Sequence, residues 1–177
     1  FTDVTFDAGL GEVHYPTPTA GWADCDNDGD LDLFIGNEGQ PGQLFENDGH
    51  GRFTDVAAAV GIVVDRVVKG VAWGDVDNDG DPDLYLSIRV GANRLYRNNG
   101  NMTFTNIAES AGVTGPRMSF PVWFWDFNND GNLDLYVASY REGVDQVAAD
   151  YLGQPHDSEG DCLYIGDGAG GFREAAR

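Results

Sequence analysis

The chain has 177 residues, enough for one domain or for a few repeated units. Its 30 Asp and Glu residues against 10 Lys and Arg give a formal net charge of −20, which excludes nucleic acid as a partner because phosphates are bound by Lys and Arg. No stretch approaches the roughly 20 apolar residues that a membrane-spanning helix needs.

A nine-residue acidic segment, here called the cassette, occurs at residues 24–32, 75–83 and 126–134. Each copy begins 51 residues after the previous one, and the first has the sequence Asp-Cys-Asp-Asn-Asp-Gly-Asp-Leu-Asp. Carboxylate or amide side chains alternate along the cassette, and the Gly at position 6 allows a sharp turn. Because Ca²⁺ takes about six to eight oxygen ligands, this pattern predicts a calcium-binding loop.

The predicted ligands lie at positions 1, 3, 5, 7 and 9, with one Ca²⁺ per cassette and about three in all. They are Asp24, Asp26, Asp28, Asp30, Asp32, Asp75, Asp77, Asp79, Asp81, Asp83, Asp126, Asn128, Asp130, Asn132 and Asp134. Position 7 is expected to contribute its backbone carbonyl. Since Asn128 offers an oxygen without a charge, the third site is predicted to be the weakest.

The cassette differs from an EF-hand and from a simple turn, and its ligands suit Ca²⁺ better than other metals. An EF-hand needs a Glu at position 12 and flanking helices, whereas this position holds Ile35, Leu86 and Val137. Mg²⁺ keeps its waters and prefers tight octahedral sites, and transition metals favour His or Cys. An ordinary Asn/Asp/Gly turn does not account for five, five and three carboxylates, whose charges repel one another unless a cation neutralises them.

Strand-like segments lie on both sides of each cassette. Residues 20–23, 70–74 and 121–125 lead into the cassettes, and alternating apolar and polar residues follow them, as in 31–35 and 84–88. A second hairpin comes next, at 43–53, 94–104 and 162–172. Four short strands per repeat are typical of a propeller blade.

We therefore predict an all-β propeller segment of three four-stranded blades, each with a Ca²⁺ loop. The repeat units are 1–52, 53–103 and 104–171, and residues 172–177 begin the next one. Three blades do not close a ring, because propellers use about four to eight. We expect further blades, from a longer protein or from other chains, to complete it.

The repeated motif resembles a known family. The cassette, followed by Leu-Tyr-Arg-Asn-Asn-Gly at 95–100 and Phe-Thr-Asn-Ile at 104–107, is similar to the FG-GAP/VCBS repeat of integrin-α-like β-propellers. Residues 119–131 and 147–156 resemble the group that carries ASPIC/UnbV domains, which includes the cartilage acidic proteins. The resemblance covers essentially the whole chain. It implies a seven-bladed, calcium-binding and usually secreted propeller, but no single agreed biochemical activity.

The third repeat departs from the 51-residue spacing by 17 extra residues, at about 141–161. We expect this insertion on the rim opposite the cassettes, where long loops on a rigid scaffold often carry function. Its candidate ligand-binding residues are Arg141, Tyr151, His156 and Asp157. The alternative is a lid that packs on a neighbouring blade. Further polar candidates on the loops leading into the first strands are His14, Tyr15, Arg66, Lys69, Arg117 and Met118.

The two cysteines are expected to be unpaired. Cys25 occupies a cassette position that holds Val76 and Phe127 in the other copies, and Cys162 lies two blades away. Two cysteines so placed cannot reach the short separation that a disulfide requires.

The favoured function is a non-enzymatic, extracellular or periplasmic module that binds a protein or a glycan, with Ca²⁺ in a structural role. Sites of moderate affinity fill at millimolar extracellular calcium, and the chain contains no G-x-S-x-G, H-E-x-x-H or P-loop motif. One alternative is a propeller domain of a polysaccharide lyase or sugar dehydratase. Another is a subunit of an extracellular assembly that uses its exposed blade edges for contact.

Overall fold

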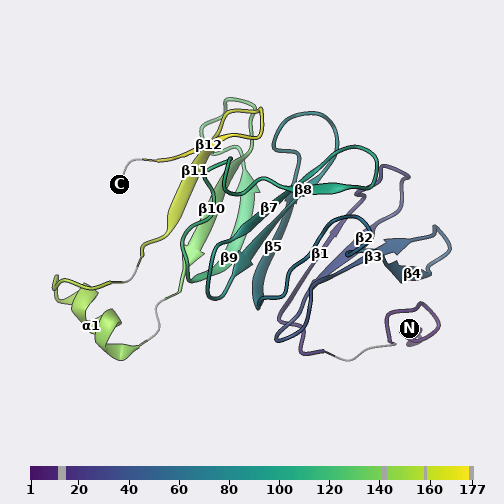
Figure 1. The fold of residues 1–177 in the computed structure, drawn as a ribbon, viewed down its shortest axis with the longest axis horizontal. Helices are drawn as coiled ribbons and strands as arrows, with labels where there is room; N and C mark the ends of the chain where they lie inside the picture. Colours follow the sequence, from purple (N-terminus) through teal and green to yellow (C-terminus); the bar gives the residue numbers. More distant parts are fainter. Residues whose placement is uncertain (12–14, 141–142, 158, 176–177) are drawn as a thin grey trace.

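Three four-stranded antiparallel sheets make up the fold (Figure 1). The structure is a computed structural model and describes residues 1–11, 15–140, 143–157 and 159–175. The sheets, here called blades one, two and three, follow one another along the chain. Blade one contains β1 (Thr19–Ala23), β2 (Asp32–Gly36), β3 (Gln43–Asn47) and β4 (Phe53–Asp55). Blade two contains β5 (Val68–Gly74), β6 (Asp83–Ile88), β7 (Arg94–Asn98) and β8 (Phe104–Asn106). Blade three contains β9 (Ser119–Trp125), β10 (Asp134–Ser139), β11 (Cys162–Gly166) and β12 (Phe172–Glu174).

Within each blade the strands lie in chain order and are joined by hairpins. Each cassette connects the first and second strands of its blade. The predicted all-β architecture of three four-stranded units is therefore confirmed. The first strands β1, β5 and β9 lie next to one another, so the blades stand side by side as in a propeller (Figure 1).

The apolar core lies between the blades. One buried cluster joins Phe34 and Leu44 of blade one to Leu84 and Leu86 of blade two. All six residues of β6 are buried, because blade two has a neighbour on each side. Each fully buried Leu or Phe contributes about 1.5–3 kcal/mol, so the packing of one blade on the next stabilises the stack.

A second cluster joins blade two to blade three in the same way. It contains Tyr85 and Leu95 from blade two and Leu135 and Val137 from blade three. Tyr85 points to the opposite face of β6 from Leu84 and Leu86, as alternation along a strand requires. Alternate residues of β6 therefore pack against blade one and against blade three.

The insertion in blade three contains an eight-residue helix, α1 (Val144–Tyr151), which the sequence had not indicated. No residue of this helix is buried, and its N-cap residue, Gly143, has no side chain that could cap it. The helix lies away from the blades, at the end opposite the hairpin that carries the third cassette (Figure 1). Among the residues that the structure describes, no helix is long and apolar enough to cross a membrane.

The strands that begin blades two and three are longer than predicted. They start at Val68 and Ser119, two residues before the expected positions. Both carry a register shift near their first residues, at Lys69 in β5 and at Phe120–Pro121 in β9. Both cysteines are buried, and neither forms a disulfide bond within the part of the chain that the structure describes, as expected.

Candidate metal centres

The three cassettes fold into the same backbone shape. In each, the Asn at position 4 and the Gly at position 6 have positive φ angles. The values are 60°, 58° and 59° for Asn27, Asn78 and Asn129, and 97°, 96° and 89° for Gly29, Gly80 and Gly131. Asn and Gly tolerate the left-handed region best. The sequence Asn-Asp-Gly therefore sets a tight loop that turns alternate side chains toward one side.

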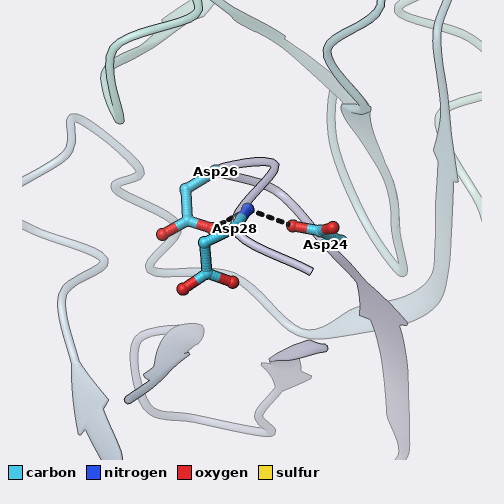
Figure 2. A group of neighbouring side chains, drawn as sticks. All are labelled: Asp24, Asp26 and Asp28. Atoms are coloured by element: carbon cyan, nitrogen blue, oxygen red, sulfur yellow. Dashed lines mark hydrogen bonds between the residues drawn. The ribbon is translucent and has the colours of Figure 1, made fainter. Parts of the chain in front are cut away.

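The first Asp of each cassette ties the loop to itself. The Asp24 carboxylate accepts hydrogen bonds from the backbone N–H groups of Asp28 and Gly29, both at 3.1 Å. The equivalent bonds to Asp75 are 3.1 and 2.9 Å, and those to Asp126 are 3.0 and 2.9 Å. Figure 2 shows the Asp28 nitrogen donating to the Asp24 carboxylate, with the Asp26 carboxylate beside it.

The ninth residue, Asp32, Asp83 or Asp134, lies at the foot of the loop and is at most 1% exposed. One oxygen of Asp83 accepts the backbone N–H of Val76, and the other accepts that of Asn98 at the end of the third strand, both at 2.8 Å. Asp32 and Asp134 make the same two bonds in their own blades at 2.9–3.0 Å. This carboxylate therefore joins the cassette to the second hairpin.

Two cassettes gather carboxylate oxygens closely enough for one cation. One carboxylate oxygen from each of Asp24, Asp26 and Asp28 lies within 4.8 Å of the other two, and the same holds for a second group in blade two. That group is Asp75, Asp77 and Asp83. Because Ca²⁺ binds oxygens at 2.3–2.6 Å, two of its ligands are separated by at most about 5 Å. Both groups fit that limit.

The second cassette contains an oxygen that lacks a partner. Asp77 Oδ1 is buried and accepts no hydrogen bond from the described residues. Burial raises the pKa of Asp77, and the neighbouring carboxylates of Asp79 and Asp75 raise it further. Burial also raises the pKa of Asp83 to about 7. A cation among these oxygens would stabilise the charged carboxylates and offset both effects, so the donor set fits a hard divalent metal ion.

In the first cassette, too, the pKa of a carboxyl group is raised. Burial raises the pKa of Asp26, and the carboxylates of Asp32, Asp28 and Asp24 add to the effect. Like charges at this spacing disfavour ionisation unless a cation lies among them. The first two cassettes are therefore alike in chemistry as well as in sequence.

In the third cassette, hydrogen bonds within the loop stabilise the charge of Asp130. Asn128 Nδ2 donates to the Asp130 carboxylate at 2.8 Å, and Asn128 Oδ1 accepts the Asp130 N–H at 2.9 Å. The backbone N–H of Asn132 and the Asn128 amide lower the pKa of Asp130. Among the described residues, no group of three carboxylates as close as those of the other cassettes is found here. The third cassette therefore offers a cation fewer close carboxylate oxygens than the first two do.

The Asn at position 4 also links neighbouring cassettes, a role that the sequence analysis missed. Asn27 Nδ2 donates to Asp81 Oδ1 of the next blade at 2.6 Å. Asn78 Nδ2 donates to Asn132 Oδ1 at 3.1 Å in the same way. The side chain at position 7 thus accepts a bond from the preceding blade, which both Asp and Asn can do. Its recurrence in all three copies was the available signal.

The candidate residues of the insertion make local contacts. His156 Nε2 lies 3.1 Å from Asp150 Oδ1, the backbone N–H of Asp157 donates to Gln146 at 3.2 Å, and Tyr151 is 90% exposed. Arg141 and His14 lie outside the described residues. Of the other polar candidates, Lys69 was expected on the loop before β5 but lies within that strand. Its side chain lines a cavity.

Known proteins share the repeat. The family model for the FG-GAP-like repeat matches residues 24–86 and 85–137. The chain is 35% identical over 111 residues to cartilage acidic protein 1 of Xenopus tropicalis, covering 59% of this chain and 17% of that protein. It is 34% identical over 114 residues to the Mus musculus protein of the same name, with the same coverage. The matched region is thus about a sixth of the length of these relatives.

Proposed function

The chain belongs to the FG-GAP-like repeat family, and from this premise we propose that it is a calcium-binding β-propeller module. It acts outside the cell, in the extracellular space or the periplasm, by binding a protein or a glycan and not by catalysis. Further blades, from the same protein or from other chains, complete a ring of seven. The calcium ions are structural, one in each cassette.

The observation that carries the proposal is the pair of close carboxylate groups in the first two cassettes. The buried, unbonded Asp77 Oδ1 supports a cation in the second. Bound calcium supplies two positive charges to each loop. The cassette residues wrap the ion, while the ninth Asp connects the wrapped loop to the second hairpin. Calcium binding would therefore stabilise the cassette end of each blade.

The net charge of the chain and the calcium affinity expected of such loops both support an extracellular location. Three calcium ions carry six positive charges, so a chain of formal charge −20 remains strongly acidic and well solvated. Loops of moderate affinity fill at millimolar calcium and stay largely empty at cytosolic levels. The similarity to cartilage acidic protein 1 agrees with an acidic module of this kind.

Thermal melting with and without a chelator tests the structural role of calcium. At a concentration 100 times the dissociation constant, one bound ion adds about 2.7 kcal/mol to the free energy of unfolding. For a chain of this size, this raises Tm by roughly 5 °C or more per site. An unchanged Tm at millimolar calcium would contradict the proposal.

Matched variants locate the effect. Asp77→Ala removes the buried carboxylate oxygen that accepts no hydrogen bond in the second cassette. This variant should show a smaller calcium-dependent increase in Tm. Asp65→Ala removes an exposed carboxylate of the same blade outside the cassette and should keep all of it. Equal responses in both variants would place the calcium elsewhere.

A further inference from the structure

The turn between β7 and β8 carries the sequence Asn101-Met102-Thr103. Asn-x-Ser/Thr, with any residue except Pro in the middle, is the acceptor sequence for oligosaccharides on the Asn side chains of secreted proteins. No other Asn in the chain is followed by Ser or Thr two residues later. Because so short a motif also arises by chance, its structural context decides what it means.

The turn shares its backbone with the equivalent turns of the other blades but differs from them in sequence. The N–H of Asn99 donates to Thr103 O at 3.0 Å, and the corresponding bonds close residues 48–52 and 167–171 at the same distance. Both of those turns have Gly at the position of Met102, whose φ angle is 53°. A side chain in this left-handed region costs about 1–3 kcal/mol. Another contact of the turn must therefore offset the strain.

That contact is made by the Met102 side chain. It lies partly buried against the core between blades one and two, with its Sδ 3.9 Å from Cys25 Sγ. Complete burial of such a side chain contributes about 1.5–3 kcal/mol, so partial burial offsets much of the strain. The residues on either side, Asn101 and Thr103, are exposed. The turn thus anchors the middle of the motif and presents both of its polar members to solvent.

The Asn101 carboxamide is open at the atom that would carry a glycan. Thr103 Oγ1 donates to Asn101 Oδ1 at 2.5 Å, which holds the hydroxyl beside the carboxamide. Asn101 Nδ2 donates no hydrogen bond within the part of the chain that the structure describes. By contrast, Asn98 is buried and its Nδ2 donates to Cys25 O at 2.7 Å. A sugar on Asn101 Nδ2 would therefore break no hydrogen bond of the turn.

The turn lies at the cassette end of blade two. A Cβ atom added to Gly100 would be 2.6 Å from Asp81 Oδ2, so the turn lies against the second cassette. The other oxygen of Asp81 accepts the Asn27 amide of the first cassette. A glycan on Asn101 would project from this end of the molecule and leave the opposite strand ends clear.

We propose that Asn101 is an N-glycosylation site. The donor is an oligosaccharide linked to a polyprenyl diphosphate, and a transferase of the export route catalyses the step. Asn101 Nδ2 loses one proton and forms a bond to the anomeric carbon of the first sugar. The bond from that carbon to the diphosphate oxygen breaks, and polyprenyl diphosphate leaves with the electron pair. This inference rests on the extracellular location in the proposed function, because such acceptor sequences are used in secreted chains.

Mass spectrometry of the protein from its native source tests the proposal. Trypsin cleaves after Arg97 and Arg117 and so releases residues 98–117, which contain the motif. We expect this peptide to carry the mass of an oligosaccharide and fragmentation to locate that mass on Asn101. An unmodified peptide in protein recovered outside the cytosol would overturn this inference alone. Recovery of the protein from the cytosol would overturn the proposed location first and this inference with it.

Variants exported from animal cells behind a signal peptide assign the modification to the motif. Asn101→Gln and Thr103→Val should each abolish the mass that peptide N-glycosidase removes, whereas Thr103→Ser, which keeps the hydroxyl, should retain it. Asn106→Gln removes another exposed Asn of the same hairpin, outside the motif, and as the matched control should also retain it. Survival of the removable mass in both Asn101→Gln and Thr103→Val would overturn the proposal.

Melting of the exported proteins separates a glycan site from a calcium site. Since Asn101 Nδ2 takes part in no hydrogen bond of the described residues, Asn101→Gln should keep the whole calcium-dependent increase in Tm. Loss of that increase would assign Asn101 to the second calcium site and overturn the proposal. If calcium stabilises neither protein, the structural role of calcium fails, while the mass on residues 98–117 still decides this inference.

Discussion

At the scale of single residues, the carboxylates of a cassette differ in their surroundings. In the first cassette three early carboxylates lie close together, and in the second Asp83, the ninth residue, lies close to Asp75 and Asp77. The ninth position is buried and accepts two backbone N–H groups from different segments. A buried N–H that loses its acceptor costs about 1–3 kcal/mol. The ninth Asp should therefore stabilise its blade even without metal.

Asp134 allows this to be tested in the blade where metal is expected to matter least. Asp134→Ala leaves the N–H groups of Phe127 and Gly166 without their acceptor. We expect the free energy of unfolding in urea, measured with chelator, to fall by about 2 kcal/mol or more. Glu109→Ala, which removes an exposed carboxylate from a loop of the third repeat, is the control. Equal losses in the two variants would show that the ninth Asp acts only through a metal.

At the scale of elements, small residues decide how closely one blade approaches the next. Gly21 of β1 lies where a Cβ atom would be 2.7 Å from Val71 Cγ1 of blade two. Gly74 of β5 has the same relation to Leu133 of blade three, at 2.8 Å. At such distances a side chain could be added only if Val71 or Leu133 moved away. The blades can therefore pack closely only while these positions stay small.

Blade three differs at the equivalent positions. Trp123 and Trp125 replace the small residues there, and they pack on Tyr136 with ring centroids 4.7 and 6.2 Å away. The tryptophans fill the space that blades one and two leave for a neighbour. A further blade packed on this face would need smaller side chains there than blades two and three have, since close-packed interiors tolerate little overpacking.

The packing rule predicts the effect of enlarging Gly21. Gly21→Val should lower the free energy of unfolding by about 1–3 kcal/mol, because the added methyl groups overlap Val71 of blade two. Ala20→Val adds two methyl groups on the exposed face of the same strand and should change stability little. Urea unfolding of both variants checks this. An unchanged stability of Gly21→Val would contradict the packing rule and show that Val71 can move aside.

The elements also show which parts of the fold the sequence could predict. Alternating strands and a repeat of fixed length specified three four-stranded blades, because each blade buries the same positions. Helix α1 was missed because it is short, follows Gly143, has no side-chain cap and buries no residue. Nothing in its local pattern demanded a helix.

The site was predictable only in part, for a related reason. The predicted ligands of each cassette are neighbours along the chain, so their spacing alone suggested a common metal site. The bond between Asn27 and Asp81 spans two blades, and the cavity near Lys69 and Tyr140 joins strand ends that are far apart in the sequence. Such contacts depend on how blades stack, which spacing within one repeat does not encode.

At the scale of the whole molecule, charge is concentrated where the cassettes meet. Thirteen of the 30 acidic residues lie in the three cassettes. Adjacent cassettes are close enough for Asn27 to reach Asp81 and for Asn78 to reach Asn132. Metal-free chains should therefore suffer repulsion between blades as well as within them, and each bound cation relieves part of both.

Differences among the cassettes predict unequal calcium affinities along the chain. The first two cassettes hold close carboxylates whose pKa values are raised at Asp26 and Asp77. In the third, the Asn128 amide already bonds to Asp130. Since calcium affinity rises with the number of charged ligands, isothermal titration should count about three ions, two of them tighter than the last.

Asn128→Asp tests the cause of this order. The substitution restores the carboxylate that both other cassettes have at position 3 and removes the amide that bonds to Asp130. We expect the weakest calcium site to tighten at least tenfold, which corresponds to about 1.4 kcal/mol, while the other two remain unchanged. Asn101→Asp, which adds a carboxylate to an exposed hairpin turn outside the cassettes, controls for the added charge. If the two variants respond alike, the difference between the sites comes from the overall field of the molecule and not from the ligand at position 3.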